Sequence, residues 1–212
     1  MNCRTIIAFV TGAIVVAAPD ATARAQGTPV DSGAGPAFMS ARFASQGAHT
    51  FYGGYRIRRA LAFIGLVVNP RTQYREAIVG LASTFQARPG ISFLGGIGVA
   101  DATDAPYSQL YLLPSVRIGR YLLDGTIEGY LPISSRGASQ VGTTPINLLV
   151  QASPRVALGA SYVLGAQRGA SPSHAFGPSA RFRIPAGSLS LDLLKGVGRV
   201  PNEFRLTAQV SY

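Results

Sequence analysis

The chain ends with the sequence Glu203-Phe204-Arg205-Leu206-Thr207-Ala208-Gln209-Val210-Ser211-Tyr212. Apolar residues fill every second position from Phe204 onward, and polar residues fill the positions between them. Because successive side chains of a β-strand point to opposite faces, this alternation predicts a strand with one apolar and one polar face. One such strand fits either a soluble barrel with an apolar interior or a membrane barrel with an apolar exterior.

The same alternation recurs upstream, in segments of about the ten residues that a tilted strand needs to cross a bilayer. Short breakers join these segments into hairpins, and longer polar stretches link the hairpins, as in outer-membrane barrels with brief periplasmic turns and longer exterior loops. The expected strands are 37–44, 49–57, 60–68, 77–86, 91–100, 109–118, 121–133, 146–152, 156–166, 179–184, 188–194 and 203–212.

The sequence therefore predicts an all-β fold, an antiparallel up-and-down transmembrane barrel of about twelve strands. Both termini of such a barrel lie on the periplasmic side, so the strand number must be even. Ten strands are the alternative if the first segments form only a leader. Eight would require merging segments across proline-containing breaks, which strand geometry disfavours.

The N-terminus carries the features of an export signal. Arg4 is followed by an apolar run over 5–18, and Ala23-Arg24-Ala25 is a small-x-small cleavage site. We therefore expect a cleaved signal peptide at 1–25, a flexible Gly- and Pro-rich leader at 26–36, and the barrel at 37–212. The single cysteine, Cys3, lies in the segment to be removed, which excludes a disulfide framework. The expected location is the outer membrane.

The formal net charge is +10, with 19 Lys and Arg residues against 9 Asp and Glu residues. These basic residues are scattered through alternating segments rather than clustered, which argues against nucleic acid as a partner. Arginine pairs well with phosphate head groups, so outer-membrane lipid and lipopolysaccharide are the expected partners. The arginines expected on exterior loops to contact lipopolysaccharide are Arg71, Arg75, Arg136, Arg168 and Arg199.

The polar faces of the expected strands hold most of the acidic residues together with several arginines. Buried charges persist only when paired, so we expect cross-strand networks of arginine and carboxylate inside the barrel. This lumen charge network comprises Glu76, Arg117, Asp124, Glu128, Arg181, Arg183, Asp192, Glu203 and Arg205. Tyrosines near strand ends are expected to form an interfacial girdle, as amphipathic rings favour that position. They are Tyr52, Tyr55, Tyr107, Tyr111, Tyr121, Tyr130, Tyr162 and Tyr212.

In these features the chain resembles the small outer-membrane β-barrel class, which includes OmpA-like, OmpX-like and porin-like proteins. The resemblance covers the region after the signal peptide by pattern, without a motif unique to one family. It implies that the ending, with Phe204 and a terminal aromatic Tyr212, is the signal read by the barrel-assembly machinery. Members of this class differ widely in activity, so the resemblance implies no single function.

The expected function is a small passive pore or a structural, surface-exposed component, and not an enzyme. The alternative is an outer-leaflet lipid hydrolase or acyltransferase, for which Ser171-Pro172-Ser173-His174 offers the one conceivable serine and histidine pair. No cofactor or metal is expected, since two loop aspartates, Asp101 and Asp104, lack the spacing of a calcium loop. The sequence leaves the oligomeric state and any transported solute open.

Overall fold

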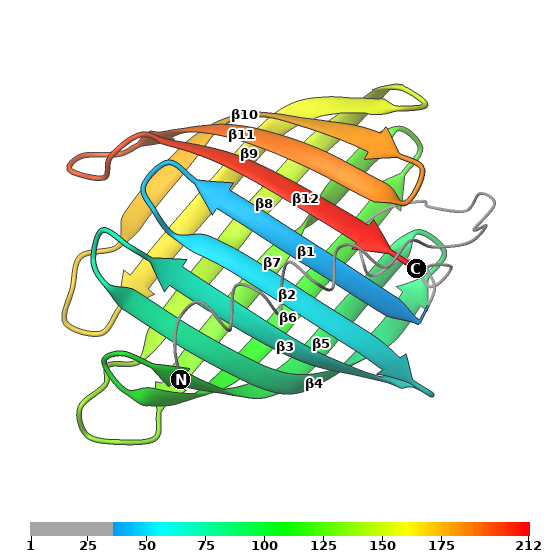
Figure 1. Cartoon of the computed structure of the whole chain (residues 1–212). Coiled ribbons are helices and arrows are strands. Elements are labelled where there is room, and N and C mark those ends of the chain that lie inside the picture. Colours follow the sequence, from blue (N-terminus) through cyan, green and yellow to red (C-terminus); the bar gives the residue numbers. More distant parts are fainter. Residues whose placement is uncertain (1–35) are drawn as a thin grey trace.

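The computed structural model describes residues 36–212, which form a closed barrel of twelve antiparallel strands (Figure 1). The predicted fold class and strand number are confirmed. The predicted signal peptide and nearly all of the leader lie outside the described residues. The strands are β1 (Ala37–Ala44), β2 (His49–Ile57), β3 (Ala60–Asn69), β4 (Tyr74–Arg88), β5 (Ile91–Ala102), β6 (Pro106–Ile118), β7 (Tyr121–Pro132), β8 (Gln140–Ser153), β9 (Val156–Gln167), β10 (Ser173–Ile184), β11 (Gly187–Gly196) and β12 (Glu203–Ser211).

Each strand pairs with its neighbours in the sequence, and β1 closes the barrel against β12. Figure 1 shows the first and last strands side by side. The closure includes a hydrogen bond of 2.9 Å from the Tyr212 amide to the Ala37 carbonyl. The first and last strands thus bring Ala37 and Tyr212 to the same end of the barrel, as an even strand number requires.

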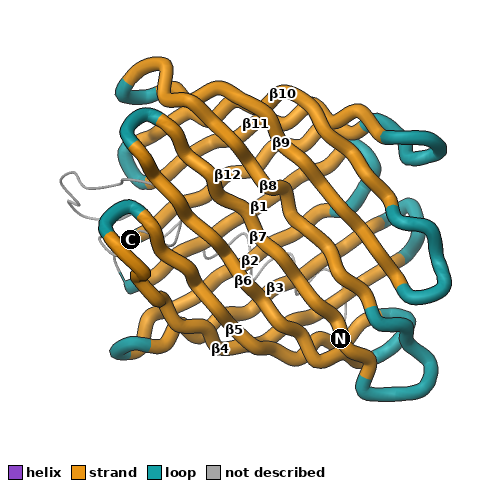
Figure 2. Tube along the Cα trace, turned by 180° about the vertical axis from the view of Figure 1, so that it is seen from behind, coloured by secondary structure: helices purple, strands orange, loops and turns teal. Residues whose placement is uncertain are grey.

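The two ends of the barrel differ in the length of their connections (Figure 2). At the end that holds Tyr212, each of the five connections contains two residues, and we call this the short-turn end. At the opposite end, the connections contain three to seven residues, and we call this the long-loop end. The predicted alternation of short turns and longer loops is present, although the loops are shorter than the sequence suggested.

The loops are shorter because several strands continue through residues assigned to loops, most clearly in β8 and β10. Both strands contain a proline, which lacks a backbone N–H to donate to a ladder. Pro145 of β8 lies where the register with β9 shifts, between Gly142 and Ile146. Pro178 of β10 pairs with Ala160 on one side only, and the ladder with β11 omits it. A bulge and a one-sided ladder thus accommodate the prolines that the sequence interpretation treated as strand ends.

The outer surface of the barrel is apolar. Each of the twelve strands carries at least one large apolar side chain that points outward and is well exposed, for example Ile64, Leu81 and Ile97 at 65%, 56% and 63%. Within residues 36–212 there is no helix long and apolar enough to span a bilayer. The exposed band on the strands instead gives the barrel the surface expected of a protein in contact with hydrocarbon.

The interior is divided into two unlike walls. On β3 to β6, inward apolar and aromatic side chains pack into one buried cluster with contributions from neighbouring strands: Leu61, Phe63, Ile78, Ala82, Leu94, Ala100, Ala105, Tyr107 and Tyr111. On β11, β12 and β1, the inward positions nearer the short-turn end carry mainly polar residues, none of which is fully buried: Ser188, Ser190, Thr207, Gln209, Ser211 and Ser40. Nearer the long-loop end, the same three strands carry the charged residues Asp192, Glu203, Arg205 and Arg42. The lumen is therefore filled on one side and lined by polar groups on the other.

Candidate functional site

All nine residues of the predicted lumen charge network lie on the inward face of their strands. The register settles this placement, because each residue pairs with an inward residue of the next strand, as Glu76 does with Val67 and Arg205 with Asp192. Three of the carboxylates are almost fully buried: Glu76 is 3% exposed, Asp124 4% and Asp192 2%. Their placement follows the period-two alternation of the strands.

The central feature of the polar wall is an ion pair between Asp124 on β7 and Arg181 on β10. The guanidinium approaches both carboxylate oxygens, with 2.8 Å between Arg181 Nη2 and Asp124 Oδ1. Because β8 and β9 separate these two strands, Arg181 must reach over two inward faces to make the contact. Such a bidentate ion pair fixes the geometry of both side chains.

The Asp124 carboxylate also belongs to a belt of hydrogen bonds along this wall. Asn147 donates to Asp124 at 2.9 Å, and Ser161 donates to the Asn147 side-chain carbonyl at 2.5 Å. Ser161 also lies 2.6 Å from Asp192, which accepts from Ser179 at 2.7 Å. The belt links β7 to β11 and gives each of its buried polar groups a partner, as a stable interior requires.

A second polar group lies nearer the long-loop end. The Glu76 carboxylate accepts from Gln109 at 2.5 Å and from the Tyr74 hydroxyl at 3.2 Å. Glu128 accepts from the hydroxyl groups of Tyr130 at 2.9 Å and Thr144 at 3.3 Å. Neutral donors thus satisfy both carboxylates.

The structure therefore differs from the expected pattern of cross-strand arginine and carboxylate pairs. Among residues 36–212, only Arg181–Asp124 and Arg205–Glu203 form ion pairs within 4.0 Å, and the second joins residues of one strand. Arg117 instead donates to the amide oxygen of Gln151 at 2.6 Å. Amide and hydroxyl groups take the role that the sequence prediction gave to arginines, because they reach a carboxylate from the same strand or from at most two strands away without spanning the lumen.

The prediction of an interfacial tyrosine girdle was correct for four of the eight tyrosines. Tyr55, Tyr121, Tyr162 and Tyr212 point outward and are between 39% and 56% exposed. The other four, Tyr52, Tyr107, Tyr111 and Tyr130, lie on the inward face, where Tyr107 is 1% exposed and Tyr111 8%. Their rings belong to the wall of the lumen rather than to the membrane interface.

Arg56 on β2, an inward residue that pairs with Leu61, was missing from the predicted set. So was the charged lumen residue Arg42 on β1. It pairs with the inward residues Thr207 and Thr50, and its charge interacts with Glu128 on the opposite side of the barrel. Its Nε atom is buried without a hydrogen-bond partner. The alternation of Ser40 and Arg42 in the first strand was the signal that could have identified it.

The serine and histidine pair of the enzymatic alternative does not form. His174 lies on β10, not on a loop, and its Nδ1 atom is 2.7 Å from the Tyr162 hydroxyl. The Ser173 hydroxyl donates instead to the Gly165 carbonyl at 3.2 Å. In the part of the chain that the structure describes, no group of three acidic, His or Cys side chains is arranged to hold a metal ion.

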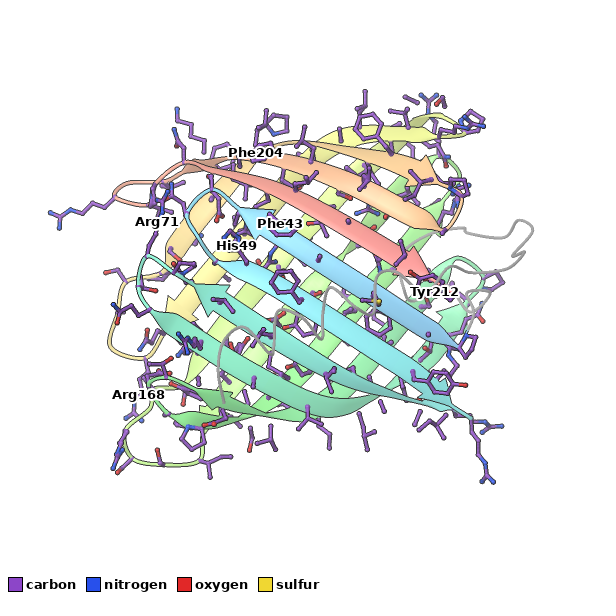
Figure 3. The ribbon with its side chains drawn as sticks, in the orientation of Figure 1. Phe43, His49, Arg71, Arg168, Phe204 and Tyr212 are labelled. Carbon is purple, nitrogen blue, oxygen red and sulfur yellow. The ribbon has the colours of Figure 1, made fainter. Side chains whose placement is uncertain are left out.

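The arginines predicted to contact lipopolysaccharide lie at the long-loop end, with one correction. Arg71, Arg136, Arg168 and Arg199 are on connections, whereas Arg75 is an exposed residue of β4. Figure 3 shows Arg71 and Arg168 at this end and Tyr212 at the other. Phe204 and Tyr212 of the predicted assembly signal point outward, 42% and 39% exposed.

Solved structures with the same architecture are outer-membrane porins. The KdgM porin aligns with a TM-score of 0.57 at 10% identity, covering 82% of this chain and 99% of that chain. The NanC porin aligns with a TM-score of 0.54 at 9% identity, covering 83% and 98%. No family model and no curated protein sequence matches the chain. At these identities the comparison confirms a porin-like fold without assigning a family.

Proposed function

We propose that this protein resides in the outer membrane and acts as a small passive pore. The observation that carries the proposal is the contrast between the two faces of one closed sheet. The outer face is a continuous apolar band, and the inner face carries the charged and hydroxyl-bearing side chains. That arrangement is stable where hydrocarbon surrounds the barrel and water can enter it.

The permeation path that we propose follows the wall formed by β11, β12 and β1. Buried apolar and aromatic side chains on β3 to β6, among them Phe63, Leu94 and Tyr111, fill their side of the lumen. On the opposite wall, Ser190, Thr207 and Gln209 are partly exposed and end in groups that hydrogen-bond to water. A narrow path of this kind suits small polar solutes and excludes folded proteins.

The porin fold of the solved relatives supports a channel over the lipid-modifying alternative. A hydrolase needs a nucleophile held within hydrogen-bond reach of its base, and Ser173 and His174 bind other groups. We accordingly propose that the chain has no catalytic role.

Planar-bilayer recording of the refolded barrel tests the proposal. We expect discrete conductance steps that are identical in size between insertions. The control is the double variant Ser190→Phe and Thr207→Phe, which fills the proposed path on neighbouring strands and should reduce the step size without changing the barrel's heat-modifiable migration. A folded wild-type barrel that gives no steps would identify a closed structural barrel instead.

A further inference from the structure

We infer that the short-turn end of the barrel is an anion-binding vestibule and that the pore passes anions in preference to cations. The inference deepens the proposed pore function and rests on it.

Each of the five short turns has an arginine within it or within two residues of it. No described Asp or Glu lies in any of these turns, although seven described carboxylates lie elsewhere in the barrel. The eight arginines at this end are Arg56, Arg58 and Arg59 at the first turn, Arg88 at the second, Arg117 and Arg120 at the third, Arg155 at the fourth, and Arg183 at the fifth.

Backbone hydrogen bonds place these turns side by side on one rim. The Arg117 amide donates to the Gly90 carbonyl of the second turn at 2.6 Å, and the Gln151 amide donates to the Arg120 carbonyl at 2.8 Å. The Arg183 amide donates to the Arg155 carbonyl at 2.8 Å, which joins the fourth turn to the strand before the fifth. The arginines therefore form a ring around one mouth of the barrel that is open at the seam between β12 and β1.

The ring has an inner and an outer part. Arg56, Arg117 and Arg183 lie on the inward face and pair with Leu61, Leu122 and Ser188. These three are partly buried, whereas the turn residues are exposed. Because Arg117 binds the neutral amide of Gln151, its charge stays uncompensated. Neither ion pair found in residues 36–212 involves a member of the ring.

Deeper in the lumen, three of the carboxylates are shielded from a passing solute. Glu76, Asp124 and Asp192 are at most 4% exposed and are held by hydrogen bonds, so a passing solute does not contact them. Glu128 and Glu203 are partly exposed, but each accepts hydrogen bonds from neighbouring side chains. Arg183 is partly exposed and takes part in neither of the two ion pairs found in residues 36–212. A charged cleft bounded by a low-dielectric wall concentrates ions of the opposite sign, so the barrel should enrich anions at this mouth.

The chemistry of guanidinium defines the ligand class. Its planar set of N–H donors matches the oxygen pairs of carboxylate and phosphate groups. Three inward guanidinium groups at one mouth can therefore bind more than one such group. We therefore assign the vestibule to small solutes that carry carboxylate or phosphate groups.

The first experiment measures the zero-current potential of single channels across a KCl gradient. We expect the sign that corresponds to chloride permeating faster than potassium. The triple variant R56Q/R117Q/R183Q should lower the anion-to-cation permeability ratio by about threefold or more, because it removes the inner part of the ring. The matched variant R58Q/R120Q/R155Q removes equal charge from exposed turns. It should have a smaller effect in 1 M salt, where the Debye length is about 3 Å.

A second experiment needs only the wild-type protein. Citrate added to one side of a single inserted channel should block the current, and citrate added to the other side should block it much more weakly. Absence of conductance steps would contradict the pore proposal. Steps with a potassium-selective potential, or a block that is equal from both sides, would overturn the vestibule while leaving the pore intact.

Discussion

The ring of Tyr52 on β2 lies over Gly65, its direct cross-strand partner on β3. A Cβ atom on Gly65 would lie 2.7 Å from Cδ1 of that ring. Phe63 has the same relation to Gly80 on β4, where a Cβ would lie 2.8 Å from Cε1. Aromatic rings over facing glycines cover backbone that has no side chain of its own, which stabilises a curved sheet.

Replacing Gly65 with valine should therefore destabilise the barrel. The added side chain would displace the Tyr52 ring from a packed position, and overpacking of this kind costs about 1–3 kcal/mol. Urea unfolding in detergent micelles, followed by tyrosine fluorescence, measures the loss. The control is Gly95→Val on β5, where a Cβ would have no neighbour within 4 Å. Equal losses in both variants would mean that the ring contact contributes nothing.

The inward tyrosines also show what sequence reasoning overlooked. Tyr52 shares its face with Arg56, and Tyr130 shares its face with Glu128, so the alternation already placed both rings inside. The general preference of tyrosine for membrane interfaces led to the opposite expectation. Where a residue preference and the strand period disagree within one strand, the period predicts the face, because a shift of one residue would turn every apolar side chain inward.

The Asp124 and Arg181 pair should be strongly coupled. Removing one partner leaves a buried charge without compensation, so each of D124A and R181A should cost about 3–5 kcal/mol of unfolding free energy. The double variant should lose clearly less than the two losses added together. A double-mutant cycle from urea unfolding measures the coupling. Additive losses would show that the two side chains act independently in the membrane.

The alternation in the sequence predicted that both side chains of this pair face the lumen, but not that they meet. β8 and β9 lie between them, and the contact depends on the curvature of the barrel and on the small inward residues of β9. The prediction of strand boundaries was limited in the same way. Pro145 and Pro178 read as breaks because the sequence does not reveal which ladder is interrupted by a bulge.

The outward face offers a direct test of contact with lipid. Leu81 on β4 is 56% exposed, and an arginine there should cost about 2–4 kcal/mol if the position lies near the bilayer centre. The control is Gln209→Arg on β12, an inward and partly exposed position where water can solvate the new charge. Refolding into phospholipid vesicles at several urea concentrations gives both values. A larger loss for the inward variant would contradict the assignment of the two faces.

The ending of the chain should govern assembly more than stability. Tyr212 closes the barrel through backbone atoms, since its amide donates to Ala37, so a change of its side chain leaves that hydrogen bond in place. We expect Tyr212→Ser combined with Phe204→Ser to lower the amount of folded barrel in membranes of producing cells. The same variant refolded from urea should lose less than about 2 kcal/mol, the order of one exposed apolar contact. Normal assembly in cells would show that another segment is recognised.

The arginines of the long-loop end should bind lipopolysaccharide. Arg71, Arg136, Arg168 and Arg199 extend from connections, and Arg75 is exposed at the adjoining end of β4. Outer-leaflet phosphates lie at this height if the short turns face the periplasm, and guanidinium binds them through paired hydrogen bonds.

Replacing these five residues with alanine should reduce the lipopolysaccharide that co-purifies with the barrel, measured as bound phosphate per protein. The matched control replaces five exposed arginines at the opposite rim with alanine, namely Arg58, Arg59, Arg88, Arg120 and Arg155. Both variants lose the same charge, so only the end of the barrel differs. An equal reduction in the two variants would indicate attraction by net charge alone. A reduction confined to the control would place the short turns, not the long loops, in the outer leaflet.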